Sequence, residues 1–405
     1  MTERKYELKP RDVLFFRDGR PMDADKTKKN DVCNVGHGAI WPRPDHLFNG
    51  VMHSLLKVSL NADYGSFTSL KIVGPYPVKG DMLYLPRPLD WDMDIELCTD
   101  TDLPEPLEYG FIDRVDGKKK YPAWIKVEDY LKYLRSEDRG CSDKSFSYAD
   151  SDLFGIEPRI GTTIDSKTGA SMRVEGARSG QYRGEYLRLK DDVSMWCMIE
   201  TGKVGVKADA PDASETPRAF VMGGQGGIVT RQETDVDLLA MFAAPKVNGE
   251  GEVFVRWTLI SPALFKQTGW LPGWCRDSRK NVAESERKDV GSVMFPGCEG
   301  CKLVGACTGK PIAFSGYDTK DGIKPTVLAV PQGSVYLFKC NSAASANALI
   351  SRLHLQRQSD DGPKGFGIGI CSVVTPTAVG RGHDKSPSAV GGGHEKDLIN
   401  ERKNS

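Results

Sequence analysis

The chain has 405 residues, of which 39% are hydrophobic and 27% charged, so it is long and apolar enough to bury a large core. Lysine plus arginine and aspartate plus glutamate number 55 each, which excludes a uniformly basic nucleic-acid-binding protein but allows a local basic groove. The sequence has no apolar run of membrane-spanning length and no signal peptide, and its ten cysteines indicate reduced thiols, so we expect a soluble, cytoplasmic protein without membrane contact.

The first part of the chain predicts a strand, a turn, a loop and a helix. An apolar strand over residues 4 to 17 ends in "RDGRP", because glycine and proline stop a strand, and the turn presents Arg17, Asp18 and Arg20 at the strand end. Apolar residues recur at helical spacing over residues 47 to 58, and Asp45 can cap that helix.

The middle of the chain is charged and irregular. Residues 100 to 150 suggest surface insertions, and residues 159 to 189 read as a long glycine-bearing loop that closes on the strand-like "EYLRL". Residues 202 to 218 look like another exposed connection.

The last third alternates strands with a helix. Strands are predicted over residues 252 to 260 and, joined by a Pro-Gln-Gly turn, over residues 326 to 338. A helix over "NSAASANALISRL" follows, then a glycine loop, a further strand and a polar tail that we expect to be disordered. Strand, helix and strand fit one half of a ferredoxin-like unit.

Glycine clusters mark three segments that could approach a polyanion. They are "GGQGG" at 223 to 227, "GFGIG" at 365 to 369 and the loop that contains Gly161. Backbone without side chains can bring N–H groups close to phosphate oxygens, although for any single cluster a plain tight turn is the simpler interpretation. Dinucleotide and P-loop sites are disfavoured, because the required spacings are missing.

Five segments occur in an order that resembles the Cmr-three family, the RAMP subunits of type III-B CRISPR effector complexes. They are "LFFRDGRPM", "RIG" with "GQYRGEYLRL", "MGGQGG", "AVPQGSVYLF" and "GFGIG", and the resemblance spans residues 6 to 374. It implies an α+β protein with two ferredoxin-like (RRM-like) domains, one over residues 1–220 with insertions and one over 221–375, followed by the disordered tail 376–405.

The same resemblance implies a function and partners. We expect a non-catalytic subunit that holds the repeat-derived 5′ end of the crRNA and docks to the large polymerase-like Cas subunit. Backbone RAMP subunits of the Cmr complex are further expected partners, and target RNA is met indirectly. Loops 23–40 and 111–150 would face these proteins, and no cofactor is expected.

Single-stranded RNA held in a fixed path needs cations for phosphates, close backbone amides and flat side chains for splayed bases. The predicted RNA-binding residues are Arg17, Asp18, Arg20, Arg159, Gly161, Arg178, Tyr182, Arg183, Arg188, Gly223, Gly224, Gln225, Gly226, Gly365, Phe366, Gly367 and Gly369. Against this, Asp18 could simply pair with a neighbouring arginine, and Tyr182 could belong to the core.

The sequence departs from the usual family pattern at two places. After the paired glycines it has Gln225 and two further glycines where a glutamate and arginines are expected, which puts a charged contact there in doubt. The helix after "WPRP" offers His53 in place of the arginine common in RAMP proteins.

Two alternatives remain open at this stage. His37, flanked by glycines, could serve a metal-independent endoribonuclease that processes precursor crRNA, because such an enzyme needs a group that titrates near neutral pH. A zinc-stabilised protein-interaction module is the other alternative, and its candidate ligands are Cys275, Cys298, Cys301 and Cys307. Only one close Cys-x2-Cys pair is present, so ordinary thiols are the simpler interpretation.

Overall fold

The structure is a computed structural model. It describes residues 2–17, 35–58, 70–98, 103–114, 121–136, 150–162, 164, 167–170, 181–201, 218–277, 289–314, 317–318, 322–323 and 325–376. The predicted disordered tail lies, apart from its first residue, outside these ranges. No helix within them is long and apolar enough to cross a membrane.

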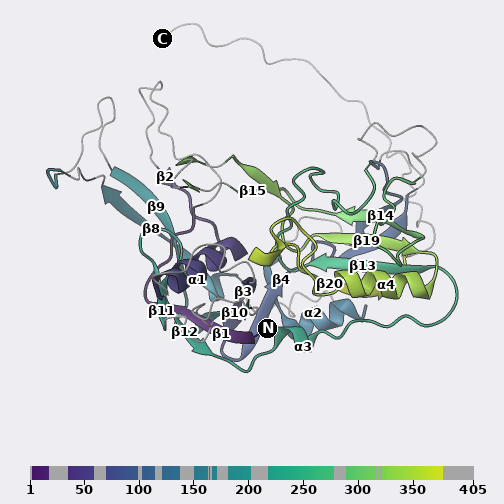
Figure 1. Cartoon of the computed structure of the whole chain (residues 1–405), viewed down its shortest axis with the longest axis horizontal. Helices are drawn as coiled ribbons and strands as arrows, with labels where there is room; N and C mark the ends of the chain where they lie inside the picture. Colours follow the sequence, from purple (N-terminus) through teal and green to yellow (C-terminus); the bar gives the residue numbers. More distant parts are fainter. Residues whose placement is uncertain are drawn as a thin grey trace, which may run out of the picture.

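The first sheet contains seven strands among the described residues, in the order β11-β12-β1-β10-β3-β4-β7 (Figure 1). They are β1 (Thr2–Pro10), β3 (Lys71–Lys79), β4 (Met82–Pro86), β7 (Trp124–Lys126), β10 (Val193–Thr201), β11 (Ala219–Val221) and β12 (Ile228–Glu233). Helix α1 (Pro44–Val58) packs against β3. Its Leu47 and Val51 are fully buried, which confirms the helical spacing read from the sequence.

The second sheet contains six strands within the described ranges, in the order β20-β13-β19-β14-β6-β5. They are β5 (Met93–Leu97), β6 (Tyr109–Asp113), β13 (Val253–Leu259), β14 (Cys301–Cys307), β19 (Val335–Cys340) and β20 (Gly369–Val374). Helix α4 (Ala343–Leu353) lies along one face of this sheet (Figure 1). Its predicted inward residues Ala346, Leu349, Ile350 and Leu353 are all buried.

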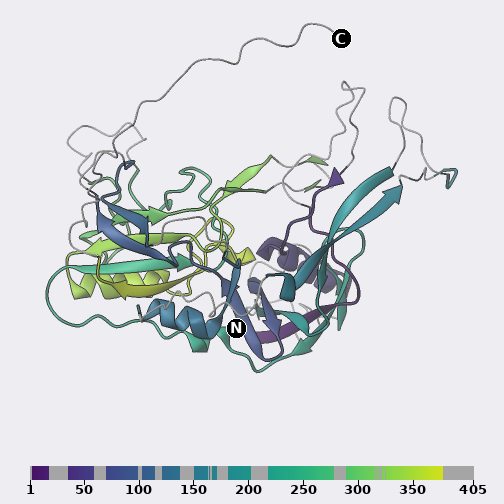
Figure 2. The same cartoon turned by 180° about the vertical axis from the view of Figure 1, so that it is seen from behind.

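Smaller elements complete the mixed, sheet-rich architecture, which agrees with the predicted α+β class. They are β2 (Val35–Gly36), β8 (Phe154–Thr162), β9 (Gln181–Leu189), β15 (Ile312–Phe314), β16 (Tyr317–Asp318), β17 (Gly322–Ile323), β18 (Val327–Ala329), α2 (Val127–Leu134) and α3 (Leu238–Met241), with single 3-10 turns at Asp150–Asp152 and Gly362–Lys364. The β8/β9 hairpin projects away from the first sheet (Figures 1 and 2).

Two local predictions for the middle of the chain need correction. Residues 154–162 form strand β8 and pair with all of β9, so the loop predicted from residue 159 is wrong at 159–162 and 181–184, whereas the strand predicted at "EYLRL" is confirmed. The 100–150 stretch is not only surface insertion, because Tyr130 and Tyr133 of α2 are fully buried. These two tyrosines lie three residues apart on one face of a short helix, and the charged residues around them made the apolar pattern hard to recognise in the sequence.

The two sheets do not divide the chain at residue 220. That position lies inside β11, and β12 pairs with β1, so the first sheet continues to Glu233. Strands β5 and β6 come from the first half of the sequence but belong to the second sheet, where Tyr109 of β6 pairs in parallel with Gly305 of β14. The halves are therefore interleaved.

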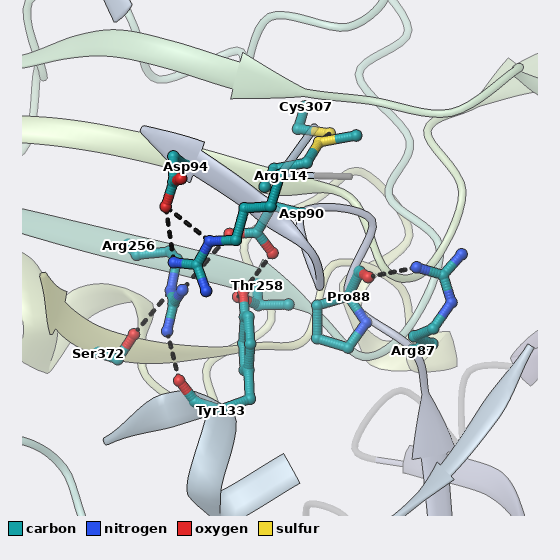
Figure 3. A network of polar contacts seen from close by, with 11 residues as sticks. Arg87, Pro88, Asp90, Asp94, Arg114, Tyr133, Arg256, Thr258, Cys307 and Ser372 are labelled. Atoms are coloured by element: carbon teal, nitrogen blue, oxygen red, sulfur yellow. Dashed lines mark hydrogen bonds and ion pairs between the residues drawn. The ribbon is translucent and has the colours of Figure 1, made fainter. Parts of the chain in front are cut away.

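A buried polar network joins the interleaved halves (Figure 3). Arg256 of β13 is 1% exposed and donates to Ser372 Oγ at 3.0 Å, to the Tyr133 carbonyl at 2.9 Å and to Asp90 Oδ2 at 3.4 Å. Asp90, also 1% exposed, accepts a second hydrogen bond from the Tyr133 hydroxyl at 2.6 Å. The guanidinium carbon lies 3.8 Å from the Tyr133 ring centroid, so this buried cation is paired and stacked.

Candidate nucleic-acid interface

Three of the sequence motifs meet along residues 14 to 17. Leu14 exchanges backbone hydrogen bonds with Leu187 of β9 at 2.9 and 2.8 Å. The Gly224 amide donates to the Phe15 carbonyl at 2.8 Å, and Arg17 bridges to Gly38 beyond β2. The chain leaving β1 is thus held between the projecting hairpin and the "MGGQGG" turn.

The hairpin has two chemically different faces, because side chains alternate along a strand. One face carries Ile160, which is 78% exposed, with Arg183 directly opposite it on β9. The other face carries Arg159 and Arg188, which lie near Asp12 in the segment after β1. The predicted arginines are therefore split between two surfaces.

We call the exposed edge where the segments of Arg17, His37, Ile160 and Arg183 pair the free-arginine surface; Arg183, His37 and Ile160 share one face of the paired strands, and Arg17 follows Phe15 on the other. Arg183 follows the register of β2, where Val35 is its backbone partner, and Arg17 is bridged to the residue after His37. Both arginines are exposed, and neither forms an ion pair within the part of the chain that the structure describes. An unneutralised Arg183 opposite the exposed Ile160, with a second unneutralised guanidinium at Arg17 on a neighbouring segment, suits a nucleic-acid strand, which offers phosphates and base faces.

Arg159 and Arg188 belong instead to a four-residue ion-pair cluster with Asp12 and Glu157. Arg159 lies 2.9 Å from Asp12 and 2.7 Å from Glu157, and Arg188 lies 2.8 Å from Asp12 and also bonds Glu157. The two guanidinium groups lower the pKa of both carboxyl groups, and those carboxylates raise the pKa of both arginines. The cluster has no net charge, so it offers less attraction to phosphate than two free arginines would.

The "GGQGG" segment is an exposed turn at the edge of this interface. Gly223 has a φ of +80°, and a β-carbon there would lie 2.5 Å from the Phe15 carbonyl oxygen, so only glycine fits. Gly224, Gln225 and Gly226 are exposed, and the amides of Gln225 and Gly226 make no backbone hydrogen bond within the described residues. These two amides are available to an external acceptor.

The "GFGIG" segment is buried, in contrast to "GGQGG". The Gly367 amide donates to the Pro262 carbonyl at 2.8 Å, and the Gly365 amide to the Gly362 carbonyl at 2.8 Å. Gly369 begins β20 against Trp257. Phe366 is 2% exposed and packs on Phe314, so its ring fills the core and we assign it a packing role instead of base stacking.

Arg43 is a structural residue that sequence reasoning missed. It forms two hydrogen bonds with the Asp45 carboxylate, at 3.0 and 3.1 Å, and donates to the Arg17 carbonyl at 3.3 Å. Its guanidinium lies 4.4 Å from the Phe314 ring centroid. Arg43 thereby connects the start of α1, the strand end at Arg17 and the aromatic pair beneath "GFGIG". The signal was present in "WPRPD", where a guanidinium and a carboxylate flank a proline at a helix start.

Other predicted residues cannot be placed in the same detail. Asp18, Arg20 and Arg178 lie outside the described residues, as does the Tyr182 side chain, although the Tyr182 backbone pairs with Gly161 near the far end of the hairpin.

Four histidines are described: His53 is exposed on α1, and the other three fall into two groups. His46 is stacked on Phe16, and burial lowers its pKa to about 4, while burial also lowers the pKa of His354, which is held between the Phe242 carbonyl and the Cys371 amide. His37 is half-buried, with Nδ1 3.2 Å from the Glu185 carboxylate. Of these three, only His37 lies on the free-arginine surface.

The four zinc candidates are not brought together. Cys301 and Cys307 occupy opposite ends of β14, about 20 Å apart at strand spacing, whereas zinc thiolates share one ion at about 2.3 Å. Cys307 contacts Met93, and Cys301 contacts Cys340. Within the described ranges no group of three or more potential ligands is arranged to hold a metal ion.

Comparison with known proteins gives a family and distant structural similarities. No curated protein matches the sequence. A chain of a type III-B Cmr-beta complex bound to cognate target RNA is similar at 14% identity and a TM-score of 0.45, covering 89% of this chain and 95% of that one. A chain of a Csm3-Csm4 subcomplex of the type III-A CRISPR-Cas interference complex gives 10% and 0.41, with coverages of 82% and 92%.

The family assignment rests on a separate match over residues 6–371. The family model that matches these residues describes a CRISPR-associated protein. The chain belongs to the family described as CRISPR-associated protein (Cas_Cmr3), which confirms the resemblance drawn from the five ordered motifs.

Proposed function

We propose that this chain is a non-catalytic guide-RNA-binding subunit of a cytoplasmic type III-B CRISPR effector that acts in antiviral defence. It holds the repeat-derived 5′ end of the crRNA and docks to the large polymerase-like Cas subunit. The observation that carries the proposal is the free-arginine surface, where Arg17 and Arg183 are exposed on neighbouring segments and the "GGQGG" turn is bonded to Phe15, two residues before Arg17. Membership of the Cas_Cmr3 family supports the same interpretation.

The strand orders support two ferredoxin-like units. Such a unit places its four strands in the order 4-1-3-2. In the first sheet β12-β1-β10-β3 has this order, and α1 connects β1 to β3 along the chain. In the second sheet β20-β13-β19-β14 has the same order, and α4 connects β19 to β20. All of these neighbours pair antiparallel, as the unit requires.

The arrangement of charges predicts how RNA binds. The protein has no net charge, so long-range attraction is weak and affinity must come from a few focused contacts. In the isolated chain we therefore expect weak, salt-dependent binding. Backbone RAMP subunits and the large subunit would supply the rest of the groove, with segments 23–40 and 111–150 as their docking segments apart from the buried β7 and α2, and target RNA would be met indirectly.

The test compares salt dependence in arginine variants. Binding of a labelled single-stranded RNA carrying the repeat-derived 5′ segment is measured by anisotropy against salt concentration, for the full chain alone and with its partner subunits. The slope of log K against log salt is about 0.7 per phosphate contact for single strands, so Arg17→Ala with Arg183→Ala should reduce it by about 1.4. Arg114→Ala, which removes an exposed arginine paired with Asp94, is the matched control. Unchanged slope and affinity in the double variant would refute the proposed surface.

A catalytic alternative is favoured by one contact. The Glu185 carboxylate beside His37 Nδ1 can orient the imidazole, the arrangement that a general base needs. If the chain is an endoribonuclease that processes precursor crRNA, incubation with repeat RNA in chelator gives site-specific cleavage that His37→Ala abolishes. Intact RNA after prolonged incubation with the wild-type chain supports the non-catalytic function.

A further inference from the structure

Cys301 and Cys340 face each other across β14 and β19. They are direct partners in the antiparallel register. The Asn341 amide donates to the Gly300 carbonyl at 3.2 Å, and the Cys301 amide donates to Cys298 instead of to Cys340. This pattern identifies Cys301 and Cys340 as a non-hydrogen-bonded pair, whose α-carbons approach to about 4.5 Å. Disulfides span about 4.4 to 6.8 Å between α-carbons, so the backbone already permits a bond.

The two sulfur atoms are already in contact. Their Sγ atoms lie 2.8 Å apart, and the exposed fractions of the residues are 2% and 0%. Cys301 Sγ also lies 3.5 Å from the Ser345 carbonyl in the first turn of α4. Both are free thiols in the structure.

Cys301 differs chemically from its neighbours. The contact between its sulfur and that of Cys340 lowers the pKa of Cys301 and raises that of Cys340. Burial raises the pKa of Cys298 to about 11 and also raises that of Cys371. Because the thiolate is the reactive form, Cys301 is the thiol of this group best suited to attack an oxidant. The exposed turn at Glu299 and Gly300 borders it.

We propose that Cys301 and Cys340 are an oxidative modification site that closes to a cross-strand disulfide with hydrogen peroxide as oxidant. The Cys301 thiolate attacks one peroxide oxygen, the O–O bond breaks, and the hydroxide released takes a proton to give water, leaving a sulfenic acid on Cys301. The Cys340 sulfur then attacks the Cys301 sulfur, its proton and the departing hydroxyl form a second water, and the S–S bond is made. In total, two thiols and one peroxide give one disulfide and two waters.

The bond would lock the strand pair that precedes α4. Cys340 ends β19 three residues before the first residue of α4, Ala343, and Ser342, the N-cap of that helix, lies between them. The disulfide would therefore hold β14, β19 and the start of α4 together, and it would raise the thermal midpoint of the second sheet. The inference does not depend on RNA binding.

The test uses the reduced full chain in native buffer. After peroxide treatment and alkylation under denaturing conditions, the expected result is a mass loss of two hydrogens and a fall in alkylated thiols by two from the ten in the sequence. Tryptic mapping without reduction should join the peptides 289–302 and 340–352. Since peptide 289–302 also contains Cys298, the Cys298→Ser variant must still form the link, and Cys301→Ser must not.

Cys371→Ser is the matched control, because this cysteine is equally buried on β20 and its loss should leave the link intact. The proposal is overturned if all ten thiols remain alkylatable, if the link runs through Cys298, or if it forms only in urea. The wild-type map decides these outcomes even where a variant fails to fold.

Discussion

The buried pair of Arg256 and Asp90 gives the sharpest stability prediction. Asp90→Asn removes the carboxylate while Arg256 stays 1% exposed with its two neutral partners, Ser372 Oγ and the Tyr133 carbonyl. An uncompensated buried charge costs about 3 to 5 kcal/mol. We therefore expect Asp90→Asn to lower the free energy of unfolding by that amount.

A double-mutant cycle separates the charge from the packing. Arg256→Met with Asp90→Asn removes both charges and keeps most of the side-chain volume, so it should be less destabilising than Asp90→Asn alone. Arg114→Met is the control, because its ion pair with Asp94 is 39% exposed on both sides and should contribute at most about 1 kcal/mol.

Urea denaturation followed by tryptophan fluorescence and circular dichroism provides the measurement. Because Asp90 and Arg256 come from the two interleaved halves, Asp90→Asn should also separate one cooperative transition into two. If Asp90→Asn unfolds at the same midpoint as Arg114→Met, or if the double variant loses the sum of the single effects, the pair does not couple the halves.

Three further predictions concern pH, the glycine turn and the ion-pair cluster. His46 has a folded pKa of about 4 against about 6.5 in the unfolded chain, so the unfolded chain binds the proton more readily and stability falls as pH drops. Between pH 7 and pH 5 the free energy of unfolding should fall by about 2 kcal/mol. Urea titrations at both pH values should show this loss in the wild type but not in His46→Gln. Gly223→Ala should cost about 2 kcal/mol or more in the same assay, because positive φ is combined with a backbone clash, whereas Gly226→Ala, at φ +70° in open space, should cost only about 1 kcal/mol; equal costs would contradict the clash. Asp12→Asn with Glu157→Gln frees two arginines, so RNA should bind more tightly with a salt slope larger by about 1.4, and an unchanged slope would show that this face does not meet RNA.

Local patterns predicted the elements whose signals are local. Strand β13 and helix α4 were found because alternation and helical spacing are visible in short windows. Strand β8 was missed because Gly155, Pro158 and Gly161 interrupt it, although its pairing with β9 satisfies the backbone. The crossing of β5 and β6 into the second sheet depends on contacts about 200 residues away in sequence, which no window contains.

The candidate site was predictable by residue type but not by pairing. The sequence supplied Arg17, Arg159, Arg183 and Arg188 as equivalent cations. Strand register determines which of these arginines is neutralised, because it places Arg183 on the face with Ile160 and places Arg159 and Arg188 on the face near Asp12. Asp12 lies about 150 positions before Arg159 along the chain, and nothing in the sequence indicated that it would pair with these arginines.

The two glycine segments show why composition alone cannot assign a nucleic-acid contact. An amide can bind a phosphate only if its hydrogen bond is not already made within the fold. In "GFGIG" the amides of Gly365 and Gly367 are committed to backbone carbonyls, and its glycines let strands and the Phe366 ring pack closely. In "GGQGG" the Gly224 amide secures the turn to Phe15, and within the described residues the amides of the exposed Gln225 and Gly226 make no backbone hydrogen bond. The same residue type thus closes the core at one position and opens a binding edge at the other, and the hydrogen-bond inventory of each amide decides which.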